Sequence, residues 1–89
     1  MTKQYELYLG QNDVDTAISY LVRVGGLFSA RKEETQLEGV QTTRVYHRRG
    51  TQDVHLFDVV RTEGDRIKVS GPFVTRSNIK EVQEALSGK

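Results

Sequence analysis

Hydrophobic residues recur along this chain at two spacings, every second residue and every third or fourth residue. Successive side chains of a strand point to opposite faces, whereas a helix gathers residues three and four positions apart on one face. Residues 3–9 show the strand spacing, with Tyr5, Leu7 and Leu9 on one side and more polar residues on the other. We therefore predict that this segment is a strand with one buried face.

A helix is predicted directly after that strand. Asn12 or Asp13 provides its N-cap, and the carboxylates of Asp13 and Asp15 suit the positive end of the helix dipole. Gly25 and Gly26 end the helix, one of them in the left-handed conformation. The core-facing residues, at the spacing i, i+3, i+4, i+7 and i+8, are Val14, Ala17, Ile18, Leu21 and Val22.

Residues 27–38 carry the weakest pattern in the chain. Residues 27–30 are compatible with a short strand, and residues 30–37 are compatible with a charged helix that has little apolar surface. We favour a strand at the start of this segment that continues as a solvated, charged loop ending near Gly39. Glu33 and Glu34 are then surface residues of that loop.

Three further strands are predicted after Gly39. Residues 40–48 are rich in β-branched and aromatic side chains, and residues 54–62 are almost continuously apolar, which favours a central place in the sheet. Residues 49–53 form a turn-rich connection between these two strands. Residues 65–70 alternate and form the third strand, so the three make an antiparallel meander.

The turn at residues 63–64 predicts the register between the last two of these strands. A two-residue loop pairs Val60 with Ile67, which is the packing expected on the face toward the core. The same loop pairs Arg61 with Arg66 on the other face.

Asp58 conflicts with that register, because it falls on the core face opposite Val69. An unpaired carboxylate there is costly. Asp58 then lies at the rim of the sheet, pairs with a cation such as Arg23 or Arg76, or marks a bulge that moves Phe57 inward.

A second helix is predicted at the end of the chain, starting near residues 77–78. Asn78 and Glu81 have the spacing of a capping box, and Gly88 ends the helix. Its apolar stripe consists of Ile79, Val82, Ala85 and Leu86. The predicted fold class is α+β, a strand, a helix, an uncertain strand, a three-strand meander and a helix, with both amphipathic helices on one face of a mostly antiparallel sheet.

Length and composition limit what this chain can do. Its 89 residues, 1–89, are expected to form one domain, and a chain of this size buries roughly 60–65% of its unfolded surface. A homodimer, or docking on a larger partner, would bury more. There is no cysteine, and no secretory signal or apolar run of about 20 residues is present, so a soluble cytoplasmic protein with no membrane segment is expected.

The net charge of +1 argues against a general electrostatic grip on nucleic acid. A dedicated nucleic-acid-binding domain usually has a pI above about 9, whereas this chain has a pI of about 8.1. Residues 31–50 carry the local excess of positive charge, with five cationic residues against three acidic residues. Binding to nucleic acid would therefore have to be local.

The basic and aromatic run at residues 44–49 is the most informative part of the sequence. Strand alternation puts Arg44, Tyr46 and Arg48 on one face. The predicted register adds side chains from the two following strands to the same face. The candidate binding residues are Arg44, Tyr46, Arg48, Arg49, Phe57, Arg61, Arg66 and Lys68, with His55 and Val59 beside them.

Several interpretations of this face stay open. Aromatic rings can stack on bases while cations follow a phosphate backbone, and the same groups can meet the carboxylates and rings of a protein. An ordinary solvated face, with Glu63 and Asp65 neutralising nearby arginines, is also common. Phe57 and Val59 favour an interface, because a solvated face seldom presents two such residues together, so a partner or residues 27–38 should cover it.

Catalytic and metal-binding interpretations are weaker. His47, Asp53 and His55 are the only conceivable metal ligands, and their spacing matches no named motif, so no metal and no cofactor is predicted. His55 and Asp58, three apart on a strand, should face opposite sides, which argues against a histidine–carboxylate pair. The chain has neither a nucleophile elbow nor a phosphate-binding loop, and it is short for a deep pocket.

The sequence therefore predicts a small, non-catalytic binding protein. The first hypothesis is nucleic-acid binding through the basic and aromatic strand face. The alternative is a protein–protein interaction module, an inhibitor, adaptor or accessory subunit, that uses the same face or the charged residues 27–38. The small size suits a phage, plasmid or bacterial accessory protein in either case.

Overall fold

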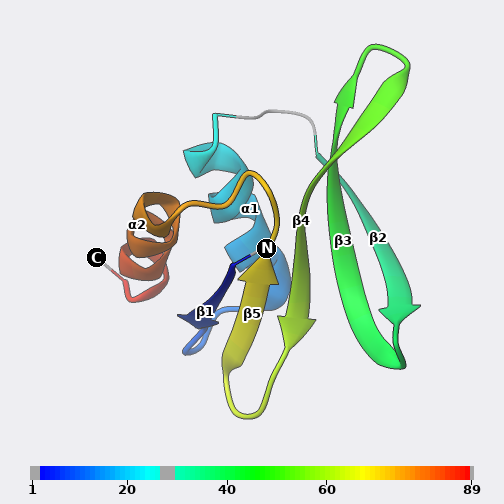
Figure 1. Cartoon of the computed structure of the whole chain (residues 1–89). Coiled ribbons are helices and arrows are strands. Elements are labelled where there is room, and N and C mark those ends of the chain that lie inside the picture. The colour runs from blue at the N-terminus through cyan, green and yellow to red at the C-terminus, as the bar shows by residue number, and fades with distance from the viewer. Residues whose placement is uncertain (1–2, 27–29, 89) are drawn as a thin grey trace.

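The computed structural model describes residues 3–26 and 30–88, and these form an α+β fold with both helices on one face of an antiparallel sheet (Figure 1). Within the described residues the sheet has five strands, in the order β1-β5-β4-β3-β2. The predicted fold class is confirmed. The elements are β1 (Gln4–Tyr8), α1 (Val14–Val24), β2 (Ala30–Leu37), β3 (Val40–Arg49), β4 (Gln52–Arg61), β5 (Arg66–Ser70) and α2 (Arg76–Leu86).

Helix α1 forms as its sequence predicts. Asp13 is the N-cap, and its side chain accepts a hydrogen bond from the backbone N–H of Thr16 at 2.8 Å. The helical stripe is buried, with Ala17, Ile18 and Leu21 in the core. Gly26 follows the helix in the left-handed conformation, at φ +77°.

Helix α2 begins slightly earlier than predicted. Its N-cap is Thr75, whose hydroxyl oxygen accepts from the backbone N–H of Asn78 at 3.1 Å, so the prediction that Asn78 caps the helix is wrong. A Thr hydroxyl three residues before that N–H has the usual capping geometry. The predicted apolar stripe is confirmed, with Val82 and Leu86 buried and Ile79 packed against the core.

Strand β2 corrects the prediction for residues 27–38. Residues 30–37 form a complete strand that pairs with β3 along its whole length, rather than a charged loop. The predicted short strand at residues 27–30 lies mostly outside the described residues. The cause is the β2–β3 turn at Glu38 and Gly39, with φ +52° and +80°, which joins two strands directly and lets the charged segment pair.

The core lies between the two helices and one face of the sheet, here called the helix face. The opposite side of the sheet, called the open face, carries neither of the two helices of the described residues (Figure 1). The strand residues on the helix face alternate with those on the open face, as the pleat requires. The buried strand residues on the helix face are Leu7, Val45, Leu56, Phe57, Val59, Ile67 and Val69.

The register between β4 and β5 differs from the prediction by one residue. Ile67 pairs with Arg61 and Val69 pairs with Val59, because the turn closes between Thr62 and Arg66 and so contains three residues, 63–65, instead of two. The backbone N–H of Thr62 donates to the carbonyl of Arg66 at 3.0 Å and closes this loop. A shift of the pairing register by one residue exchanges the two faces of a strand, so β4 presents Phe57 and Val59 to the core.

Strand β4 also contains a β-bulge at Leu56. Val45 of β3 pairs with Phe57, while the next residue, Tyr46, pairs with His55, so Leu56 has no partner of its own. Leu56 and Phe57 are both buried. The extra residue reverses the alternation within β4. Regular alternation counted back from Phe57 would place His55 on the helix face, but His55 lies on the open face and Val54 on the helix face.

Candidate binding interface on the open face

Most of the predicted basic and aromatic side chains lie together on the open face. The pairing of Arg44 with Asp58, Tyr46 with His55 and Arg48 with Asp53 sets these residues opposite the buried Val45. Arg66 and Lys68 of β5 alternate with the buried Ile67 and Val69, so they reach the same face. The binding role of these residues stays a prediction.

Four of the other predicted neighbours are not on this face. Phe57 and Val59 are core residues, only 4% and 2% exposed, so the expectation that they form part of an open platform is wrong. Arg61 pairs with Ile67, and Arg49 pairs with Gln52 one position beyond Arg48, so both lie on the side of the helices. The shifted β4–β5 register accounts for Phe57, Val59 and Arg61. Phe57 and Val59 therefore give no reason to expect that a partner covers the open face.

A histidine–carboxylate pair lies at the middle of the open face. Nε2 of His55 is 2.8 Å from Oδ1 of Asp58, and Nε of Arg44 donates to the same oxygen at 3.0 Å. The prediction that His55 and Asp58 face opposite sides is wrong, because the bulge at Leu56 lies between them. Asp58 is also not a core residue, and its cationic partner is Arg44 rather than Arg23 or Arg76.

The cluster continues from β4 across β3 to β2. The rings of Tyr46 and His55 lie 5.7 Å apart at an interplanar angle of 55°, and the guanidinium carbon of Arg31 is 4.8 Å from the centre of the Tyr46 ring. Arg31 also pairs with Asp53 at 2.8 Å and with Glu33 at 3.3 Å. These carboxylates, Asp53 first, raise the pKa of Arg31 above its usual value.

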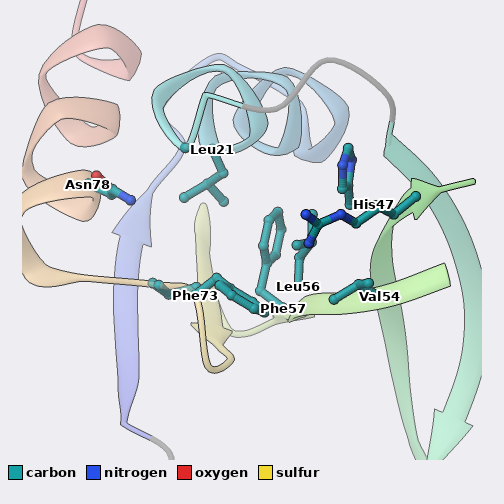
Figure 2. Close-up of a pocket in the computed structure, with 10 residues that line it drawn as sticks. Leu21, His47, Val54, Leu56, Phe57, Phe73 and Asn78 are labelled. Atoms are coloured by element: carbon teal, nitrogen blue, oxygen red, sulfur yellow. The ribbon is translucent and has the colours of Figure 1, made fainter. Parts of the chain in front are cut away.

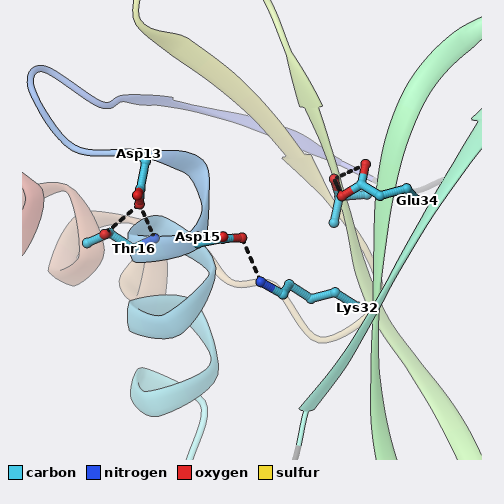
Figure 3. A network of polar contacts seen from close by, with 6 residues as sticks. Asp13, Asp15, Thr16, Lys32 and Glu34 are labelled. Carbon is cyan, nitrogen blue, oxygen red and sulfur yellow. Dashed lines mark hydrogen bonds and ion pairs between the residues drawn. The ribbon is translucent and has the colours of Figure 1, made fainter.

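Arg31 and Glu33 also belong to this face and were not predicted from the sequence. Their alternation with Lys32 and Glu34 was a usable signal, but it has meaning only if residues 30–37 form a strand. Lys32 and Glu34 lie on the other side of β2. Figure 3 shows Lys32 reaching Asp15 of α1, at 2.6 Å, while Glu34 accepts from the hydroxyl of Thr43 at 2.9 Å.

A cavity of about 440 Å³ lies on the opposite side of the sheet from this cluster. Figure 2 shows Leu21 of α1, Phe57 of β4 and Phe73 of the β5–α2 loop directed toward it. Its described lining contains no acidic residue. The lining residues are Leu21, Gly25, His47, Arg49, Val54, Leu56, Phe57, Phe73, Val74 and Asn78.

The three conceivable metal ligands are separated by the sheet. His47 lines the cavity on the helix face, whereas Asp53 and His55 lie on the open face. Among residues 3–26 and 30–88, no group of three or more histidine or acidic side chains is arranged to hold a metal ion. Within the same residues, neither helix has the length and apolar character of a membrane span.

Comparisons with known proteins leave the geometry as the sole basis for function. No protein-family model, no curated protein and no solved structure matches this chain. The arrangement itself offers two features, a polar open face with interleaved charges and rings, and an apolar cavity with a basic margin on the other side of the sheet.

Proposed function

We propose that this protein is a non-catalytic binding module whose open face docks on a protein partner. The observation that supports this choice is the pairing of its charges. Arg31, Arg44 and Arg66 each contact a carboxylate on the same face, Asp53, Asp58 and Glu6 respectively. A surface of interleaved opposite charges suits a protein, which carries both signs, better than a polyphosphate, which carries one.

The aromatic part of the cluster gives this surface a suitable centre. Tyr46 and Arg31, which lies against the Tyr46 ring, are of the residue types that are enriched where protein partners bind most strongly, and His55 lies beside Tyr46 on the neighbouring strand β4. Contacts among Arg31, Tyr46 and His55 also hold these side chains in place before binding, which lowers the entropy lost on association. The open face is therefore a partly pre-organised interface.

Catalysis is not part of the proposal. His55 and Asp58 could exchange a proton with a bound group, but they lie on the open face of the sheet, whereas the apolar cavity is on the helix face. Exclusion of water and precise positioning supply much of an enzyme's advantage, and an open face offers little of either. Retention in the cytoplasm belongs to this proposal as well.

Site-specific photocrosslinking tests the proposal. A photoreactive phenylalanine analogue replaces Tyr46 or Lys68 on the open face, or Lys80 on the exposed side of α2 as the control. In a lysate of the source organism, positions 46 and 68 should give the same saturable crosslink to a protein, and position 80 should not. Crosslinks that are equal at all three positions would contradict docking through the open face.

Nucleic-acid binding is the competing outcome, and oligonucleotide titrations detect it directly. Binding through phosphates should weaken with salt, with a log–log slope of about −0.7 to −0.9 for each phosphate contacted. The Tyr46→Ala, Arg48→Ala double variant and the Arg76→Ala, Lys80→Ala control are compared. Salt-sensitive binding that is lost only in the first variant would show that the partner of the open face is a nucleic acid rather than a protein.

The cavity supports a second candidate function, binding of a small amphipathic anion. Its volume of about 440 Å³ suits a small molecule, and apolar side chains form most of its described lining. The polar residues among them are His47, Arg49 and Asn78, so the electrostatic preference is for a negative head group. A medium-chain carboxylate has this chemistry.

Arg48 and Arg49 form a matched pair for testing the cavity, since they are adjacent but lie on opposite faces of the sheet. Decanoate should displace the fluorescent probe 8-anilinonaphthalene-1-sulfonate from the wild-type protein. Arg49→Glu should weaken this displacement several-fold and Arg48→Glu should leave it unchanged. Equal displacement by decyltrimethylammonium, or equal effects of both variants, would contradict the anion site.

A further inference from the structure

The two edges of the sheet differ in how their backbone groups are satisfied. At the β1 edge, the side chain of Gln83 of α2 makes two hydrogen bonds to the backbone of Tyr8. Its Nε2 donates to the Tyr8 carbonyl at 2.9 Å, and its Oε1 accepts from the Tyr8 N–H at 2.8 Å. Strand β1 is also only five residues long. This edge is therefore short and partly covered, which hinders pairing with another strand.

The β2 edge has a different construction. Strand β2 is eight residues long, and every residue except Thr35 is exposed. It contains no proline, its pairing with β3 runs from Ala30 to Leu37 without a register shift, and it is the outermost strand of the described sheet. A long, regular and exposed edge strand is a template for another strand.

The β2–β3 turn shows which backbone groups are available. The two turn residues have the left-handed conformations of a type I′ hairpin, in which the flanking residues, Leu37 and Val40, form a hydrogen-bonded pair. Hydrogen-bonded and non-hydrogen-bonded pairs alternate along the two strands from there, so the backbone groups of Glu33 and Thr35 bond to β3. The backbone N–H and C=O groups of Lys32 and Glu34 point outward.

The charges along β2 are complementary to a reversed copy of the same strand. Two cations, Arg31 and Lys32, precede two acids, Glu33 and Glu34. Antiparallel pairing about a two-fold axis brings the cationic end of one strand against the acidic end of the other. The lysine that would oppose such pairing is held by Asp15 of its own chain, at 2.6 Å.

We propose that a second copy of this chain pairs with β2 in antiparallel fashion, about a two-fold axis at Lys32. Residues that pair across the interface must lie on the same face of the joined sheet. The two-fold axis must therefore pair one residue with the same residue of the second copy. At Lys32, Arg31 of each copy lies opposite Glu33 of the other in the close, non-hydrogen-bonded positions, and the two lysines occupy the wider positions. An axis at Glu33 would instead bring two glutamates into the closest pair.

Such a dimer joins two sheets into one continuous sheet. The axis is perpendicular to the sheet, so both open faces lie on the same side and both helical layers lie on the other. The backbone groups of Ala30, Lys32 and Glu34 then gain partners across the interface. This inference concerns an edge of the sheet and holds whether or not the open face has the proposed partner.

Charge exchange at two positions tests both the edge and the register. By sedimentation equilibrium the wild-type chain should be a monomer–dimer system. Arg31→Glu and Glu33→Arg should each raise the dimer dissociation constant about tenfold, because each turns two symmetry-related pairs repulsive. The double variant, Arg31→Glu with Glu33→Arg, should recover most of the affinity. Failure of the double variant to recover while it remains folded by circular dichroism would overturn the register.

A proline substitution tests the edge itself. Glu34→Pro removes an outward N–H and leaves the β2–β3 hydrogen bonds in place, so it should give a folded monomer. In the wild-type dimer the amide protons of Lys32 and Glu34 should exchange more slowly as the protein concentration rises. A dimer that survives Glu34→Pro, or a wild-type chain that stays monomeric at millimolar concentration with rapid exchange at Lys32, would overturn the proposal.

Discussion

His55 and Asp58 are three residues apart in one strand, yet their side chains meet on the same face, with Nε2 of His55 2.8 Å from Oδ1 of Asp58. Regular alternation would separate them across the sheet. The extra residue at Leu56 removes one step of the alternation and brings them together. The same carboxylate oxygen accepts from Arg44, so Asp58 is the central acceptor of the open face.

Asp58→Ala should destabilise the fold by about 1 kcal/mol, because it leaves Arg44 and His55 without their shared acceptor at a partly exposed site. The side chain of Asp58 is 19% exposed, against 50% for Glu33. Urea denaturation measures the change, and Glu33→Ala is the matched control, with a smaller expected loss. Equal losses in the two variants would show that the shared contact adds nothing.

Gly71→Ala should be more costly, at about 3 kcal/mol. A Cβ on Gly71 would lie 2.6 Å from Cα and 2.8 Å from Cβ of Phe57, and would also collide with the carbonyl oxygen of Leu56. Since two of these are backbone atoms at the bulge, the strand must move. Thermal unfolding checks this, with Ser70→Ala as a neighbouring control, and a stable Gly71→Ala protein would mean that the β4 bulge is not closely packed.

Gln83→Ala should expose the backbone of Tyr8 at the β1 edge. The two hydrogen bonds from one amide side chain are lost together, and a destabilisation of about 1 kcal/mol is expected. Amide exchange at Tyr8 should accelerate, while exchange at Val69 in the centre of the sheet should follow only the change in global stability. Unchanged exchange at Tyr8 would argue against this side-chain cover.

The N-cap of α1 should make stability fall in acid. The hydroxyl and then the backbone N–H of Thr16 donate to the Asp13 carboxylate and lower its pKa below the usual 3.8. A group whose pKa is lower in the folded state stabilises it above the unfolded pKa, and this contribution is lost as the pH falls through the folded pKa.

Asp13→Asn keeps a capping acceptor but removes this titration. The difference in melting temperature between wild type and Asp13→Asn should therefore shrink as the pH falls from about 5 to about 2. A difference that is constant over this range would show that the charge of Asp13 does not contribute. Asp15→Asn in the first turn is the comparison, because the hydrogen bond to its carboxylate comes from Lys32, whereas Asp13 accepts from Thr16.

The sequence contains enough information for the helices and for the meander of β3, β4 and β5, because these segments have strong local periodicity and short connections, whereas the places of β1 and β2 in the sheet were not predicted. Ile67 and Val69 alternate with Arg66 and Lys68 and are buried as predicted, although Val60, the predicted partner of Ile67, pairs with Lys68 instead. The burial of Ala17, Ile18 and Leu21 was likewise predicted from their helical spacing. Near-continuous apolar character also placed β4 correctly inside the sheet.

The faces of β4 could not be predicted in the same way, because they depend on two single-residue features. The β4–β5 loop has three residues rather than two, and the bulge adds Leu56. An almost continuously apolar strand gives little alternation, and its one signal was Asp58, whose place on the predicted core face left a bulge with an inward Phe57 open as an alternative. Phe57 was assigned to the wrong face for this reason, whereas His55 reached the expected face only because the two shifts cancel.

The bulge at Leu56 has a consequence for how this protein tolerates change. It divides β4 into two halves whose inward positions have opposite parity, Val54 before the bulge and Phe57 and Val59 after it. Deleting Leu56 would join His55 directly to Phe57 in regular alternation, so His55 would stay on the open face and Val54 on the helix face. A regular pairing of Leu56 with Tyr46, by contrast, would turn His55 to the helix face, so the open face depends on Leu56 remaining unpaired.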